Sequence, residues 1–196
     1  MLRPTPAPAP ALRSVLAALG SPTAVNEART PALRAAPGPL SPELPLPVHV
    51  LRISAAPGQE PGSRLVGWRF LIRSGDRAIA AADTMLTPDG WSFSHFFEGP
   101  YVAATERALA QAEALPGTYQ PRLLSVPELY MLTLWLHTEE DPDGAEPGAE
   151  SADVLVPLAP APPGIAPHRP YRVADLLPVL STRLAPPPLL GSAAPA

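Results

Sequence analysis

The sequence predicts an α+β fold: an antiparallel sheet of about six to seven strands (β-meander, helix, long hairpin) with amphipathic helices packed on one face. Three observations favour this fold. Several segments after residue 46 alternate apolar and polar residues, the segment 101–115 has helical periodicity, and strands and helices do not alternate along the chain. The third observation argues against a doubly wound nucleotide-binding fold, in which a helix follows each strand.

Proline usage indicates the domain organisation. The chain has 196 residues and 31 prolines, which cluster near its two ends and in inner loops. We therefore expect a Pro/Ala-rich flexible arm at 1–45, a single α+β domain at 46–184 and a disordered tail at 185–196. Apolar residues at helical spacing predict a short helix at 11–19, which either packs on its own domain or docks on a partner.

The first half of the domain is predicted to be a meander of four strands, at 48–54, 65–73, 77–86 and 91–97. The sequences SGD and TPDG, which separate the last three of them, are typical of tight turns. In the second strand, Trp68, Phe70 and Ile72 share one face, while Arg69 and Arg73 lie on the other. This alternation is expected of an antiparallel strand that is buried on one side.

The fourth strand opens the stretch WSFSHFFEGPY, which is dense in aromatic residues. Strict alternation places Trp91, Phe93 and Phe97 on the same face as His95, and the three aromatic side chains are assigned to the core. Phe96 then points the other way. We therefore expect Phe96 to be exposed and available for binding a partner.

The best-defined element is a helix at 101–115, which follows a Gly-Pro entrance and ends before Pro116. Its apolar side predicts packing on the meander. The later run 129–136 is apolar on both parities, which is typical of a central strand covered on two faces. The segment 153–159 is expected to return as the second strand of a long hairpin, and 173–184 has helical spacing.

Composition excludes several kinds of chemistry. The chain has no cysteine and no lysine, so disulfides, thiol nucleophiles, a Walker A lysine and lysine Schiff bases are impossible. Its four histidines lie far apart without a metal-binding motif, so we predict no metal and no cofactor. The net charge of −4 argues against nucleic-acid binding, and no apolar run is long enough to span a membrane.

The expected location is cytoplasmic. The N-terminus only partly resembles a signal peptide, because Arg13 interrupts its apolar stretch and prolines precede that stretch. Export is the weaker alternative.

His95 is the strongest candidate for catalysis, because an imidazole beside aromatic residues is partly desolvated and titrates near neutral pH. A general base needs an orienting partner. Asp83 on the neighbouring strand and the hydroxyl group of Tyr130 are the candidates. The alternative, which we favour, is a histidine with a structural role, since no catalytic motif surrounds it.

We expect a non-catalytic module of a GC-rich bacterium that binds another macromolecule, either a protein partner or a second copy of the chain. A chain rich in Ala, Pro, Gly and Arg is consistent with a GC-rich genome. The predicted binding residues are Phe96, His95, Arg69 and Arg73. The alternative is a small-molecule-binding protein or enzyme, with a pocket between the sheet and the helix near His95.

Overall fold

The computed structural model describes residues 1–26, 29–52, 62–138 and 152–184. The strands in these ranges are β1 (Leu40–Arg52), β2 (Gly62–Ser74), β3 (Arg77–Thr87), β4 (Gly90–Phe97), β5 (Tyr119–Val126), β6 (Met131–Thr138), β7 (Val154–Pro157) and β8 (Tyr171–Arg172). The helices are α1 (Ala9–Leu19), α2 (Pro22–Val25), α3 (Pro31–Ala35), α4 (Pro100–Glu113), α5 (Val173–Leu184) and the short 3-10 helix η1 (Pro127–Leu129). The predicted α+β class is confirmed.

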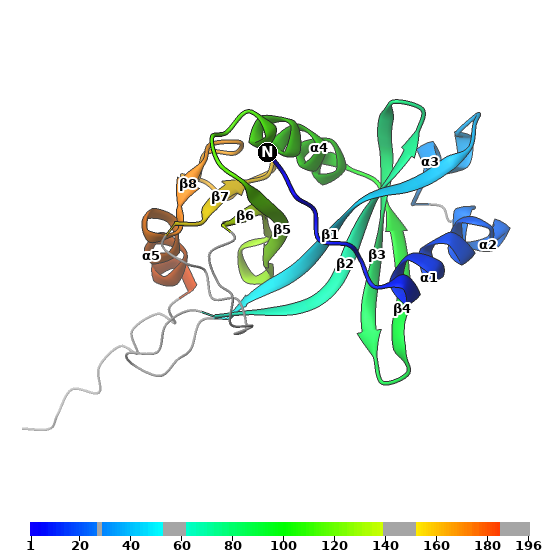
Figure 1. Ribbon diagram of the computed structural model, residues 1–196, viewed down its shortest axis with the longest axis horizontal. Coiled ribbons are helices and arrows are strands. Elements are labelled where there is room, and N and C mark those ends of the chain that lie inside the picture. The colour runs from blue at the N-terminus through cyan, green and yellow to red at the C-terminus, as the bar shows by residue number, and fades with distance from the viewer. Residues whose placement is uncertain (27–28, 53–61, 139–151, 185–196) are drawn as a thin grey trace, which may run out of the picture.

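The strands form one sheet, in the order β4-β3-β2-β1-β5-β6-β7-β8. Neighbouring strands are antiparallel except β1 and β5, which pair in parallel where residues 48–50 lie opposite 123–125. The sheet is therefore mixed, mostly antiparallel and slightly larger than expected. The parallel pair arises because α4 carries the chain from the outer strand β4 back to the middle of the sheet, where β5 joins beside β1 (Figure 1).

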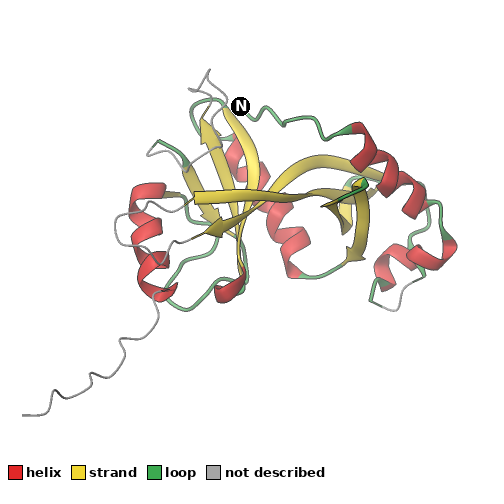
Figure 2. Cartoon of the chain, turned by 90° about the horizontal axis from the view of Figure 1, so that it is seen from below, coloured by secondary structure: helices red, strands yellow, loops and turns green. Residues whose placement is uncertain are grey.

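The helices cover both faces of the sheet, whereas the sequence predicted helices on one face. α4 packs on one face, and α1 and α5 pack on the other face at opposite ends of the sheet (Figures 1 and 2). The strands explain this arrangement. Trp68 and Phe70 of β2 belong to the cluster under α1, while Leu71 between them belongs to the cluster under α4. A sheet that is apolar on both sides needs a cover on each.

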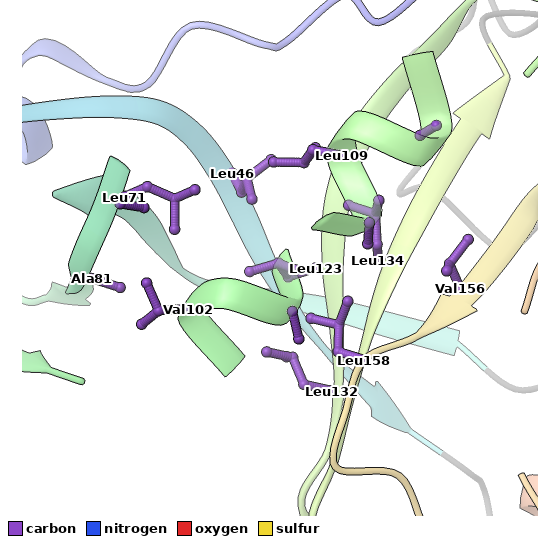
Figure 3. Packing of buried hydrophobic residues seen from close by; sticks show 14 of the residues in the cluster. Leu46, Leu71, Ala81, Val102, Leu109, Leu123, Leu132, Leu134, Val156 and Leu158 are labelled. Atoms are coloured by element: carbon purple, nitrogen blue, oxygen red, sulfur yellow. The ribbon is translucent and has the colours of Figure 1, made fainter. Parts of the chain in front are cut away.

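The cluster under α4 joins the two halves of the sheet. Leu46 of β1, Leu71 of β2 and Ala81 of β3 pack with Val102 and Leu109 of α4 (Figure 3). The same cluster continues into the second half through buried residues of β5, β6 and β7, namely Leu123, Leu132, Leu134, Leu136 and Val156. The β1–β4 half and the β5–β8 half therefore share one core on this side.

α1 lies in the segment that was expected to be a flexible arm. It includes the whole range 11–19 that was predicted to be helical. Its buried residues Ala11, Val15 and Ala18 pack with residues of β2, β3 and β4. Of the two alternatives for this helix, packing on its own domain is the arrangement in the structure. The predicted tail at 185–196 lies outside the described residues.

β1 begins at Leu40, instead of near residue 48 as predicted. Its first half, LSPELPLP, contains prolines, which cannot donate to a strand ladder. The strand tolerates them because only β2 pairs with β1 there, and β5 joins the other edge of β1 only at 48–50. A bulge between Glu43 and Leu46, with Leu44 at φ 49°, interrupts the pairing at this point.

The second half of the domain follows the predicted order. η1 begins at Pro127 and separates β5 from β6, and all residues of β6 are buried except Thr138 at its end. β7 returns antiparallel to β6, as predicted for the long hairpin. The helix predicted at 173–184 is α5, which covers the face opposite α4.

Candidate functional site

β4 forms one edge of the sheet and carries His95 and Phe96. It has 8 residues, whereas β8 at the other edge has only 2. Within the described ranges no strand pairs with the outer side of β4, and α1 and α2 pack beside this strand. Ser94 and His95 are exposed on this edge strand.

A bulge at Ser94 breaks the alternation on which the sequence prediction depended. Asp83 of β3 lies opposite His95, but the next residue, Thr84, lies opposite Phe93. Ser94 therefore has no opposite residue on β3. One extra residue in a strand exchanges the two faces for every residue beyond it.

The bulge changes the position of two phenylalanines. Phe96 joins Trp91 and Phe93 in the cluster under α1 and is only 2% exposed. The prediction that Phe96 is exposed for binding is therefore wrong, because the bulge turns its side chain into the core. Phe97 packs instead against the cluster under α4, on the opposite face.

His95 and Asp83 are adjacent, but they do not form a catalytic pair in the described structure. Both carboxylate oxygens of Asp83 accept hydrogen bonds from Arg69, at 2.8 Å from Nε and 2.8 Å from Nη2. The His95 ring lies 3.0 Å from the hydroxyl group of Ser94, measured at Nδ1. Arg69 also stacks over the ring of Phe97, with its guanidinium carbon 4.5 Å from the ring centroid. The arginine, and not the histidine, is the partner of Asp83.

Tyr130 forms a hydrogen bond through its backbone carbonyl group, and not through the hydroxyl group that was predicted to orient His95. Its side chain is 89% exposed, and its carbonyl oxygen lies 2.7 Å from the hydroxyl group of Tyr101, the donor. The Pro160 carbonyl oxygen is a second acceptor for that hydroxyl group, at 3.1 Å. Burial raises the pKa of the Tyr101 hydroxyl above its ordinary value, and the positive charge of Arg69 offsets part of this rise.

Arg73 links the sheet to α4. Its Nη1 donates to Glu106 of α4 at 2.8 Å, its Nη2 donates to the carbonyl oxygen of Asp76, and its Nε lies 3.6 Å from Glu43. Arg73 also lines a pocket of about 240 Å³ between the sheet and α4. The pocket expected from the sequence was near His95, but His95 does not line this one.

Sequence reasoning missed a buried polar network in the β5–β8 half. Asp153, just before β7, is completely buried. Its Oδ2 accepts a hydrogen bond from Trp135 Nε1 at 2.6 Å and lies 3.0 Å from His137 Nδ1. Its Oδ1 accepts bonds from both the backbone N–H and the hydroxyl group of Thr138, each at 2.9 Å. A buried carboxylate is tolerated when donors surround it in this way.

His49 of β1 and Arg122 of β5 extend this network. The His49 ring packs edge-on against Trp135, and Arg122 stacks over the Trp135 ring with its guanidinium carbon 5.2 Å from the centroid. Burial, followed by the nearby charges of Arg122 and His137, lowers the pKa of His49 to about 4. Burial also lowers the pKa of Arg122, and the negative charge of Asp153 opposes this shift.

A correct register for the β6–β7 hairpin is the signal that would have found this network. Leu136 lies opposite Val154, so His137 of β6 and Asp153, the residue before β7, are adjacent. Trp135 and His137 share a face because they are two residues apart on β6. His49 and Arg122 come from strands whose parallel pairing no local pattern indicates.

The described residues contain no group of three or more His, Cys, Asp or Glu side chains that could hold a metal ion. Among the helices that the structure describes, none combines the length and the apolar character needed to span a membrane. Comparison of the chain with protein-family models, curated proteins and solved structures finds no match.

Proposed function

We propose that this protein is a non-catalytic binding module that takes up an extended protein segment along the outer edge of β4. The observation that carries the proposal is the length of the unpaired edge. β4, at one edge of the sheet, has 8 residues and no described strand on its outer side, whereas β8, at the other edge, has only 2 residues. Edge strands with unpaired backbone groups are templates for an added strand, and several peptide-binding domains work in this way.

The side chains around β4 support this proposal. Met85 and Leu86 of β3 stand opposite Ser92 and Trp91, and Leu86 is 63% exposed. Exposed apolar side chains beside an open edge provide contacts for the side chains of an added strand. β4 has no proline and no lysine to block pairing, and the bulge at Ser94 is the one common protective feature that it carries.

The polar residues near β4 favour binding over catalysis. Arg69 holds Asp83 with two hydrogen bonds, so the carboxylate is not available to orient His95. Tyr130 bonds Tyr101 through its backbone. His95 is left as an exposed side chain on the binding edge, where it can donate or accept a hydrogen bond with a partner.

Substitutions at Ser94 test the proposal, because this residue is exposed and its bulge position has no opposite residue on β3. Tagged wild-type protein, Ser94→Pro and Ser94→Lys are used to capture partners from cells that naturally express the chain. Proline removes the backbone donor of residue 94, and lysine adds a charge to the edge. Ala174→Lys adds the same charge to an exposed position of α5 as the control.

We expect the wild-type protein and Ala174→Lys to recover the same partner, and both Ser94 variants to lose at least 90% of it, an effect on the order of 1.4 kcal/mol or more. Light scattering of the purified proteins separates a different partner from a second copy of the chain. A monomeric wild-type protein without a reproducible partner, or a partner retained by both Ser94 variants, contradicts the proposal.

A further inference from the structure

The pocket between the sheet and α4 lies where the sheet is incomplete. β1 carries its bulge at Leu44 there, and β5 pairs with β1 only further along, at 48–50. An isolated parallel bridge between Leu2 and Tyr119 places the start of the chain beside β5 in this gap. The resulting pocket of about 240 Å³ is lined mainly by apolar side chains from the chain start, β1, α4 and β5.

The pocket has an apolar floor and an acidic mouth. Leu46 and Leu109 are almost completely buried in the floor. Ala110 and Glu113, which are exposed residues of α4, and the half-buried Glu106 lie at the mouth. A cavity with apolar walls and a few polar groups at one end suits an amphiphilic ligand. Its volume is below the roughly 300 to 1,000 Å³ usual for drug-sized ligands, so the ligand is small.

The charges at the mouth select the head group of that ligand. Among the described residues that line the pocket, Arg73 is the only basic one, and it already bonds Glu106 Oε1 and the Asp76 carbonyl oxygen. The ammonium group of Met1, next to the lining residue Leu2, donates to the Gly117 carbonyl oxygen. Arg73 and Glu106 therefore offset each other, and an anionic head group would meet the remaining carboxylate of Glu113 and no unpaired cation in the described part of the pocket.

The position of Glu113 adds an independent argument. Glu113 is the last residue of α4, and no basic residue lies in the last turn of this helix. The C-terminal end of a helix carries partial negative charge, which disfavours a carboxylate and favours a cation. Glu113 and the end of α4 therefore make the mouth electronegative, and a bound cation would stabilise both.

We propose that this pocket binds a small amphiphile with an unbranched apolar chain and a protonated amine head group. The chain packs against Leu46 and Leu109, and the ammonium group bonds the carboxylate of Glu113 at the mouth. No residue of β4 lines this pocket, so a result that contradicts one of the two proposals does not affect the other.

Titrations with two probes of equal carbon number test the head-group preference. n-Octylammonium chloride and sodium octanoate are added to the full chain, and backbone amide shifts are followed by NMR. We expect saturable shifts at residues of the pocket with n-octylammonium, and binding of octanoate that is weaker by a factor on the order of ten or more. Raising the salt concentration should weaken the ammonium probe, because salt screens exposed charges.

Two variants locate the binding. Ala110→Phe fills the mouth from an exposed helix position, and Ala103→Phe makes the same change at an exposed α4 position outside the pocket. We expect Ala110→Phe to lose binding by roughly tenfold or more and Ala103→Phe to retain it. Glu113→Gln keeps the shape of the mouth and removes its charge, and it should reduce n-octylammonium affinity several-fold while leaving octanoate unchanged or stronger.

Three results would overturn the proposal. One is octanoate binding as tightly as n-octylammonium, and another is equal binding of n-octylammonium to Ala110→Phe and Ala103→Phe. The third is the absence of saturable shifts in the wild-type protein. Thermal melting of each variant is recorded alongside, and if Ala110→Phe does not fold, Glu113→Gln alone decides the question.

Discussion

Each half of the sheet places one histidine of a strand beside one aspartate, Asp83 within β3 and Asp153 just before β7, and the two pairs differ in their environment. His95 lies opposite Asp83, but Asp83 bonds Arg69 and His95 is exposed. His137 bonds Asp153, which is completely buried. A histidine next to an aspartate is therefore solvent-exposed in the β1–β4 half, whereas in the β5–β8 half the same two residue types form the centre of a buried network.

The difference shows that burial distinguishes polar groups that stabilise the fold from polar groups that are accessible to a partner. A buried carboxylate must keep its donors, because each unsatisfied polar group costs about 1–3 kcal/mol. The Arg69–Asp83 ion pair is less completely buried, with side chains 12% and 21% exposed, so water still reaches both charges and offsets part of the loss when one partner is removed. The polar residues of the β5–β8 half are therefore needed for the fold, whereas His95 on the β4 edge has no such structural role and is available to the partner that we propose.

The largest expected effect is the loss of Asp153. Asp153→Ala removes the acceptor of Trp135 Nε1, His137 and Thr138, and it should lower the free energy of unfolding by about 4 kcal/mol. Asp83→Ala leaves the mostly buried Arg69 without its partner but removes a less completely buried carboxylate, so it should cost about 2 kcal/mol. Urea unfolding of both variants measures the difference, and equal losses would contradict the contrast between the two halves.

Phe96→Ala tests the bulge on β4. Because Phe96 is buried under α1, its truncation should lower the free energy of unfolding by about 3 kcal/mol. Without the bulge, Phe96 would lie on the α4 face, where Phe97 is only partly buried, and the same substitution would cost roughly 1 kcal/mol. Denaturant unfolding distinguishes these values directly.

Acid should destabilise the β5–β8 half through His49. The pKa of His49 is about 4 in the folded chain and 6.5 in the unfolded chain, so the unfolded chain binds a proton first as the pH falls. The stability from neutral His49 is complete above pH 6.5 and is lost between pH 6.5 and 4. The expected loss is about 2 kcal/mol. His49→Phe should flatten the stability curve in this window, and an unchanged slope would show that His49 is not the group responsible.

The smallest expected effect is at His95. His95→Ala removes an exposed side chain. In the described structure, the ring of His95 has one hydrogen-bond partner, the hydroxyl group of Ser94. The free energy of unfolding should change by less than about 0.5 kcal/mol. If the partner contacts this side chain, capture by the variant should fall while its melting temperature stays the same. A loss of stability comparable to that of Asp153→Ala would remove the distinction between the two pairs.

The sequence was a good guide to the elements that have a local signature. Turn residues marked the β3–β4 hairpin, helical spacing marked α4 and α5, and apolar runs on both parities marked the buried strand β6. These patterns depend on neighbours within a few residues, which a single sequence contains.

Features that depend on pairing between distant segments could not be predicted in the same way. The bulge at Ser94 is specified by the register between β3 and β4, and it exchanged the predicted positions of Phe96 and Phe97. The proline-containing start of β1 is a strand because β5 leaves that edge unpaired. The network around Asp153 combines residues from four separate segments of the chain.

The most direct test of the β4 proposal is hydrogen exchange of the protein with and without its captured partner. Backbone amides that form new strand bonds exchange more slowly, so we predict that the segment 90–97 slows by at least about tenfold in the complex. The buried strand at 131–138 should exchange at the same rate in both samples. A complex that leaves 90–97 unchanged and protects another surface would contradict the proposal that β4 is the binding edge.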